Sequence, residues 1–169
     1  MEREHGFSLF ELMIVVAIVL IIAVIAIPNL VRAKISANES SAVQTVRQIA
    51  TAELTYHNSY SSIGFAPDLK SLGGPAVGCS PSPAGACIVD SVVISGVKSG
   101  YVFFAAGFAP GGTPTNTQFV SSAAPQRFNG TGTRNFCIAT DDGSVRAMIG
   151  SPGGTPAPDV TTCVTYPLL

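Results

Sequence analysis

Residues 6 to 28 read GFSLFELMIVVAIVLIIAVIAIP, and this stretch decides how the rest of the chain can fold. From Phe7 to Ile27 the side chains are apolar apart from Ser8 and Glu11, and Glu11 is the only one with a full charge. A helix of this length is about 31 Å long, which matches the hydrocarbon core of a bilayer. The stretch therefore predicts a helix suited to lipid that carries one carboxylate.

That carboxylate decides between three interpretations of the apolar run. A secretory signal peptide is shorter and has a small-residue cleavage site after its apolar part, which is absent here. A plain membrane anchor explains the length, but not why a group costing roughly 2.5–3.5 kcal/mol near the bilayer centre is kept. If the chain is cut after Gly6, Phe7 gains an α-amino group four residues before Glu11. Pairing within one helix or between neighbouring helices would offset much of the burial cost and set the axial register of stacked copies.

Glycine and proline divide the chain sharply. Of 17 glycines, 16 lie at position 64 or later, and 11 of the 12 prolines lie at position 67 or later. This distribution predicts one helix from Phe7 to about Tyr60, on the order of 80 Å long, followed by a loop-rich β region. Pro28 lacks an N–H and crowds the carbonyl of Val24, so we expect a kink or weak point there.

The second half of the expected helix is amphipathic. Its apolar residues recur at helical spacing, and polar residues fill the other side, so this half is expected to lie against a folded domain. The apolar positions are Ala42, Val43, Val46, Ile49, Ala50 and Leu54.

Beyond residue 60 the pattern is that of loops and short strands. We expect a helical turn around Asp68 to Leu72 and a short strand within CIVDSVVIS, residues 87 to 95. Four strands are expected further on, the last two joined by the turn signal DDGS at residues 141 to 144. Their ranges are Tyr101 to Phe108, about Thr117 to Ala123, Arg134 to Ala139 and Val145 to Ile149.

Four cysteines, Cys79, Cys87, Cys137 and Cys163, all follow the apolar segment. An even number on the far side of a membrane suggests two disulfides, for which three connectivities exist. We favour Cys79–Cys87 with Cys137–Cys163, because the first pair closes a short Pro/Gly/Ser loop. Free thiols in a reducing compartment are the alternative, and a zinc site is less supported because no C-x-x-C spacing occurs.

Composition excludes some classes of function. Hydrophobic residues make up 47% of the chain and charged residues 11%, against roughly 25% in ordinary soluble domains. The net charge of −1 does not indicate a general nucleic-acid binder. A histidine, His57, has neither a nucleophile motif nor an orienting acid near it in sequence, so a packing role is preferred to catalysis. Asp141 and Asp142 are read as a hairpin turn rather than a calcium site.

The motif GFSLFELMIVV resembles the processing site of type IV pilins and the related pseudopilins. The resemblance implies that a membrane peptidase cleaves after Gly6 and methylates the new amine of Phe7. It also implies that Glu11 is the acidic residue at the fifth mature position, and that Pro28 occupies a position where family members commonly have proline. TYHNSYSSIGFAPDLKSLG, residues 55 to 73, and GYVFFAAGF, residues 100 to 108, look similar to the small bacterial pilins and the major pseudopilin.

This family implies an α+β fold in which a long N-terminal helix packs on a four-stranded antiparallel sheet. We expect five segments: a leader (1–6), a membrane and filament-core helix (7–28), an amphipathic half (29–60), a connecting loop (61–99), and a sheet with a disulfide-bounded C-terminal region (100–169).

The function implied is that of a structural subunit, the major pilin of a type IV pilus, without enzymatic activity, cofactor or metal. Expected partners are further copies of the chain, the prepilin peptidase, an inner-membrane assembly platform and the membrane itself. Nucleic acid is not a default partner, although DNA uptake is one use of such pili. The expected location is the inner membrane before assembly and an extracellular pilus afterwards.

Two rival functions remain open. One is a major-type pseudopilin of a type II secretion system, which would form a periplasmic pseudopilus. The other is a membrane-anchored secreted enzyme or binding domain. Sequence does not choose among adhesion, motility, DNA uptake and secretion, nor does it decide glycosylation at the triplets beginning at Asn38 and Asn129.

Overall fold

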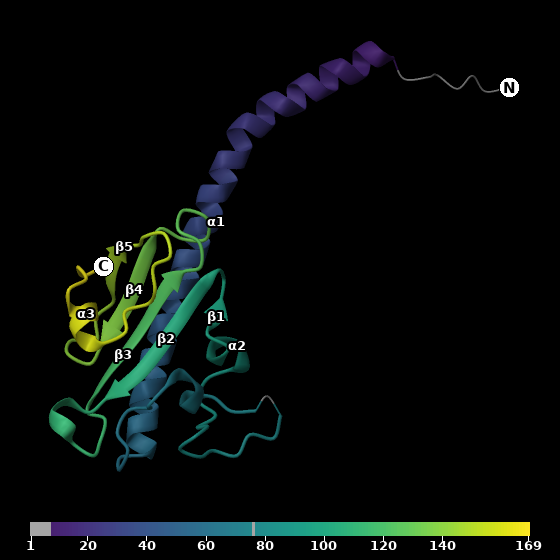
Figure 1. Cartoon of the computed structure of the whole chain (residues 1–169). Helices are drawn as coiled ribbons and strands as arrows, with labels where there is room; N and C mark the ends of the chain where they lie inside the picture. Colours follow the sequence, from purple (N-terminus) through teal and green to yellow (C-terminus); the bar gives the residue numbers. More distant parts are fainter. Residues whose placement is uncertain (1–7, 76) are drawn as a thin grey trace. The chain divides into compact units, whose positions relative to one another are not determined.

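The computed structural model describes residues 8–75 and 77–169, which are coloured along the chain in Figure 1. The chain consists of two compact units, Met1–Lys34 and Ile35–Leu169. In the first unit, the described structure is the opening part of helix α1 (Leu9–Ser59), whose first turn includes a hydrogen bond from Leu12 N to Ser8 O of 3.2 Å. The helix is continuous through Pro28.

In the second unit, one face of the remaining part of α1 packs into the core. Ala42, Val46 and Ile49 are completely buried, as the amphipathic pattern predicts. The prediction for Leu54 was wrong, because its side chain is 53% exposed. The buried stripe instead continues through Glu53 and Tyr56, which keep the three- and four-residue spacing of one helix face.

A five-stranded antiparallel sheet in the order β1-β2-β3-β4-β5 accompanies this helix. Four of the strands coincide closely with the predicted ones. The strands are β1 (Val97–Lys98), β2 (Tyr101–Phe108), β3 (Gln118–Pro125), β4 (Arg134–Ala139) and β5 (Arg146–Ile149).

The additional strand, β1, was not predicted. It pairs with β2 through a two-residue turn in which Ser99 and Gly100 have φ angles of 50° and 73°. Two successive positive φ values are what a tight hairpin turn requires, and Ser-Gly supplies them. A strand of two residues is too short to show an alternating pattern in sequence.

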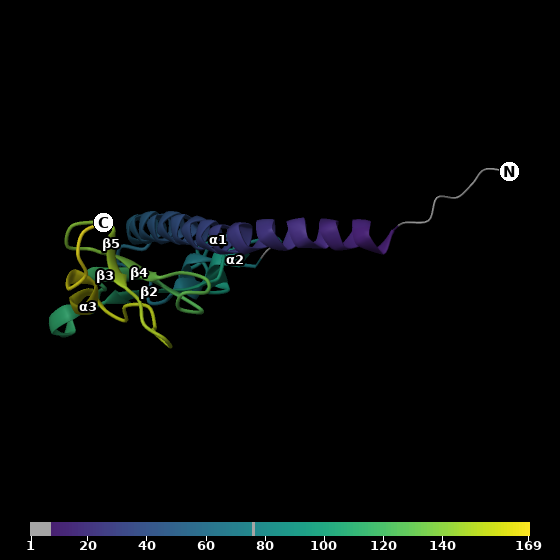
Figure 2. The same ribbon diagram turned by 90° about the horizontal axis from the view of Figure 1, so that it is seen from above.

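The sheet has a different layer on each face, as Figure 2 shows from above. On one face, Phe103 and Phe136 join the α1 side chains in the main core. On the other face, helix α3 (Val160–Val164) packs on β3 and β4, and Cys163 and Tyr166 join Val120 in a second cluster. Strand β3 is consequently buried on both faces.

Short capped turns fill the connecting region. The 3-10 turn η1 (Leu69–Leu72) begins where predicted, with Asp68 Oδ1 accepting from Ser71 N at 2.8 Å. The strand predicted within residues 87–95 is wrong, because this segment holds helix α2 (Ser91–Ile94). The Asp90 side chain accepts from Val93 N at 3.0 Å, and this cap outweighs the strand preference of the β-branched residues.

The remaining elements lie near the C-terminal part of the chain. A 3-10 turn, η2 (Pro110–Gly112), lies between β2 and β3. Helix α3 was not predicted, although Asp159 caps it by accepting from Thr162 N at 2.7 Å. The Pro/Gly-rich stretch before Asp159 hides this signal in the sequence.

Two disulfides fasten the second unit. Cys79 is bonded to Cys87, eight residues away, in the connecting region. Cys137 of β4 is bonded to Cys163 of α3, with a Cα–Cα distance of 5.8 Å, so this bond ties α3 to the sheet.

Beyond the short strand β1, the rest of β2 is bonded to neighbouring backbone, and so is β5 at the other edge of the sheet. Beside β2, Gly107 N donates to Ala66 O at 2.7 Å and Phe103 N donates to Gly96 O at 2.8 Å. Beside β5, Ala147 N donates to Pro167 O at 2.9 Å, and Leu169 N reaches Val145 O at 3.0 Å. Edge strands left open would be templates for pairing with other chains.

Candidate functional site

The first part of α1 is an exposed apolar surface. Phe10 and Val24 are 71% and 74% exposed. In the most apolar stretch of 18 residues in this helix, no residue is buried. By length and composition this helix could cross a membrane. Soluble monomers rarely expose a continuous apolar surface of this kind, so the segment requires lipid or other helices around it.

Glu11 lies in the first turn of this exposed helix. A negative side chain there is favoured by the positive end of the helix dipole. Gly6 and Phe7, the expected cleavage site and methylated residue, lie outside the described residues. Pairing between Glu11 and the Phe7 amine therefore stays a prediction.

Pro28 lies inside the same helix. Because proline has no N–H, the carbonyl four residues earlier, that of Val24, lacks its usual helical donor. The role of Pro28 as a weak point also stays a prediction.

A buried carboxylate, Glu39, lies a short distance beyond the end of the first unit. Its Oε1 accepts from Thr133 N at 2.8 Å and from Thr133 Oγ1 at 2.6 Å. Its Oε2 accepts from Arg134 Nε at 3.0 Å and Nη2 at 2.8 Å, which forms an ion pair. Burial acts to raise the pKa of Glu39, but the bonds from Thr133 and Arg134 outweigh it and lower the pKa. Glu39 is thus a charged anchor between α1 and the start of β4.

A second buried carboxyl group, Glu53, has a different environment. Its side chain is completely buried, and Oε2 accepts from Ala66 N at 2.8 Å. Oε1 has no hydrogen-bond partner among the described residues. Burial raises the pKa of Glu53 to about 8, even though the hydrogen bond from Ala66 N acts to lower the pKa, and the nearby Asp68 charge adds to the increase. The group is therefore mainly protonated at neutral pH, although a glutamate in water is ionised there.

Neither Glu39 nor Glu53 was recognised from the sequence. Both belong to one stripe with Ala42, Val46, Ile49 and Tyr56, at successive helical spacings of three or four residues. Extending the apolar stripe across its polar members would have located both carboxyl groups on the buried face.

The other residues considered in the sequence have structural environments. His57 stacks on Phe65 with ring centroids 4.7 Å apart, which fits packing. Asp142 pairs with Arg146 at 2.6 Å and accepts from Ser144 N at 3.0 Å, as a turn residue does. Within the described residues no group of three or more potential metal ligands gathers. The Asn38 amide donates to Thr131 O at 2.9 Å and is half-buried.

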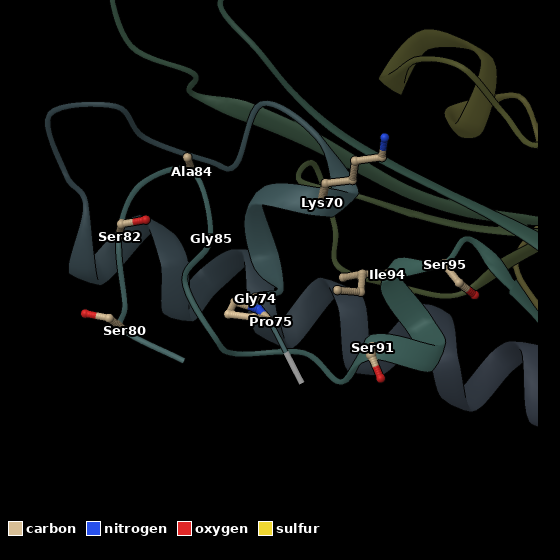
Figure 3. A pocket seen from close by; sticks show the side chains of 10 residues that line it. All are labelled: Lys70, Gly74, Pro75, Ser80, Ser82, Ala84, Gly85, Ser91, Ile94 and Ser95. Atoms are coloured by element: carbon tan, nitrogen blue, oxygen red, sulfur yellow. The ribbon is translucent and has the colours of Figure 1, made fainter. Parts of the chain in front are cut away.

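A hollow of about 580 Å³ lies in the connecting region, between η1, the 80–85 loop and α2 (Figure 3). In Figure 3 most of its lining consists of glycine, alanine, proline and serine residues, together with Ile94, and Lys70 is the ionisable side chain among them. The hollow therefore brings no acid–base pair or activated nucleophile together. It gives no support to the rival of an anchored enzyme.

The chain is similar to known proteins. Residues 1–27 match the family described as the prokaryotic N-terminal methylation motif. The chain is 33% identical over 125 residues to the "Type IV wide pilus major component PilA4" of Thermus thermophilus, a match that covers 72% of this chain and 95% of the relative.

A second relative is the "Type IV major pilin protein PilA" of Myxococcus xanthus. The chain is 40% identical to it over 73 residues, which is 39% of this chain and 33% of that relative. The chain thus spans only about a third of the Myxococcus protein. No solved structure gives a significant match.

Proposed function

The chain belongs to the type IV pilin family, and from this premise we propose that it is the major structural subunit of a type IV pilus. It is a filament protein and not an enzyme. The observation that carries the proposal is the match over nearly the whole length of a relative that is itself a major pilus component. The exposed apolar part of α1 supports it, because such a surface needs other helices or lipid.

Self-assembly and processing by a prepilin peptidase are implied by the family. In detail, the peptidase cuts after Gly6 and methylates the amine of Phe7. Segment 1–6 is then lost as the leader, and segment 7–28 lies first in the inner membrane and later in the filament core. Segment 29–60 joins this core to the connecting loop (61–99) and the sheet region (100–169).

Assembly exchanges lipid contacts for helix contacts, so the hydrophobic effect alone gives little net gain. Pairing of Glu11 with the amine of Phe7 on the same or a neighbouring copy supplies the selective attraction and fixes the axial register. Pro28 lets the helix bend or locally open as neighbouring copies pack. An inner-membrane assembly platform drives the transfer.

Electron microscopy of fibres sheared from cells that produce the protein, with mass spectrometry of the main band, tests this function. We expect fibres whose principal chain begins at methylated Phe7. Surface fibres that lack this chain, or a major band that retains Met1, would contradict the proposal. Absence of surface fibres together with impaired protein secretion would instead support the pseudopilin alternative.

A further inference from the structure

The second buried glutamate of α1, Glu53, joins the helix to the loop that follows it. Oε2 accepts from Ala66 N at 2.8 Å, and both Glu53 and Ala66 are completely buried. The remaining oxygen, Oε1, has no partner among the described residues. This contact spans 13 residues and is a polar link between the end of α1 and the stretch 63–66.

The same stretch is bonded to the sheet on its other side. Ala66 O accepts from Gly107 N of β2 at 2.7 Å. Phe65 N donates to Asn116 O at 3.0 Å, and the Asn116 side chain donates to Phe65 O at 2.9 Å. Glu53 therefore completes a cluster of groups that holds helix, loop and strand end together.

We propose that Glu53 is a proton-dependent clasp, which in its neutral form holds the loop 60–68 on the end of α1 and on losing its proton releases that loop. A carboxylate with one oxygen unpaired in the protein interior has a large desolvation cost. When the loop opens, the carboxylate regains water. Ionisation therefore favours the open form.

Among the described residues, no salt bridge pairs Glu53 with a cation. Asp68, on the loop side, raises the pKa of Glu53 further by like-charge repulsion. On the helix side, burial raises the pKa of Tyr56 above its usual value near 10, so its hydroxyl stays neutral when Glu53 titrates. Tyr60 stacks on Tyr56, and His57 stacks on Phe65.

The strand ends that bond to the same loop contribute Gly107 and Asn116, neither of which ionises. Burial lifts the pKa of Glu53 to about 8, well above its ordinary value of 4.5. The closed form therefore binds more protons than the open form between these two values. The clasp is strongest below pH 4.5 and weakens as the pH rises through 8.

Hydrogen exchange of the Ala66 amide in the purified full chain, held in detergent micelles, tests the clasp. Its protection factor should fall about tenfold for each pH unit between about pH 5 and 8, and then level off. In Glu53→Gln, which keeps a neutral acceptor for the Ala66 N–H, the protection factor should not change over this range. In Glu39→Gln, a matched control at the other buried carboxyl, the wild-type fall at Ala66 should persist.

A wild-type protection factor that is flat across this range would overturn the proposal, as would a fall that persists in Glu53→Gln. If Glu53→Gln does not fold, the side-chain carboxyl carbon resonance of Glu53 in the wild-type chain decides the matter. A midpoint near pH 8 that coincides with the levelling of Ala66 exchange supports the clasp, and a midpoint below about pH 6 refutes it. Neither readout depends on filament formation, so this test and the test of the pilus role fail independently.

Discussion

The two parts of α1 belong to one helix but differ in how far their apolar side chains are buried. From Leu9 to Val31 nearly every apolar side chain is exposed, whereas Ala42, Val46 and Ile49 further along are fully buried. The three glutamates of the helix differ in burial in the same way. Glu11 lies exposed in the first part, while Glu39 and Glu53 have partners within the second unit. The first part therefore needs stabilising contacts from outside its own unit, whereas the second part obtains them within its unit.

The largest expected effect falls on the first part. Glu11→Ala should leave membrane insertion unchanged and strongly reduce the yield of sheared filaments, because loss of one member of a buried charge pair costs about 3–5 kcal/mol. Quantitative immunoblots of sheared and membrane fractions measure the two effects separately. A normal filament yield in this variant would count against the Glu11–Phe7 pairing.

A matched pair of isoleucines measures the division directly. Ile49 is fully buried and Ile21 is 66% exposed. Ile49→Ala should lower the free energy of unfolding by about 2–5 kcal/mol, while Ile21→Ala should leave it unchanged. Urea unfolding of the full chain in detergent, followed by near-UV circular dichroism, checks both. Equal losses in the two variants would erase the proposed distinction between the two parts of the helix.

Glu39→Gln tests the charged anchor. Replacing the carboxylate leaves Arg134 without its anion, and we expect a loss of about 1–3 kcal/mol at neutral pH. Because the folded pKa of Glu39 is lowered, its stabilisation is present above pH 4.5 and is lost as the pH falls below that value.

The difference in unfolding free energy between wild type and Glu39→Gln should therefore shrink as the pH is lowered from 7 to about 3. The same unfolding assay, repeated at several pH values, measures it. A difference that stays constant over this range would show that the Glu39 charge does not contribute.

The smallest expected effect concerns one hydroxyl between helix and sheet. Ser121 is completely buried on β3, and its Oγ donates to Val46 O of α1 at 3.1 Å. Ser121→Ala should cost about 0.5–1.5 kcal/mol. Ser40→Ala is its control, because the exposed Ser40 hydroxyl bonds only to Ser36 O of its own helix. Similar small losses in both variants would mean that the contact across the core adds nothing.

Much of this molecule could be predicted from sequence because its strongest signals are long or alternating. The helix and the four longer strands, such as Tyr101–Phe108, were predicted within a few residues. The turn capped by Asp68 was predicted, but other features that depend on one cap or one turn were missed. Asp90 caps a helical turn, α2, although the β-branched residues in that turn favour strands. Ser99-Gly100 forms the turn of a hairpin whose first strand has only two residues.

Glu39 and Glu53 were missed for a different reason. Their polarity removed them from the apolar stripe, although their spacing placed them on it. The partners that make their burial possible, Thr133, Arg134 and Ala66, are up to 95 residues away in sequence. No local pattern reports such a pairing. By contrast, the proposed assembly determinants Gly6, Phe7 and Glu11 lie within six consecutive residues, so a local pattern in the sequence is enough to predict them.

The short or covered edges of the sheet have a consequence for any fibre that this protein forms. Gly107 of β2 and Ala147 of β5 already donate to neighbouring backbone, and the outer strand β1 has only two residues, so little edge is left on which strands of different copies could join into a continuous ladder. Growth through helices should give X-ray fibre patterns with a layer line near 5.4 Å, the pitch of the α-helix, and not the meridional spacing of about 4.7 Å typical of amyloid. Fibres of this kind should also cause no increase in the fluorescence of amyloid-specific dyes.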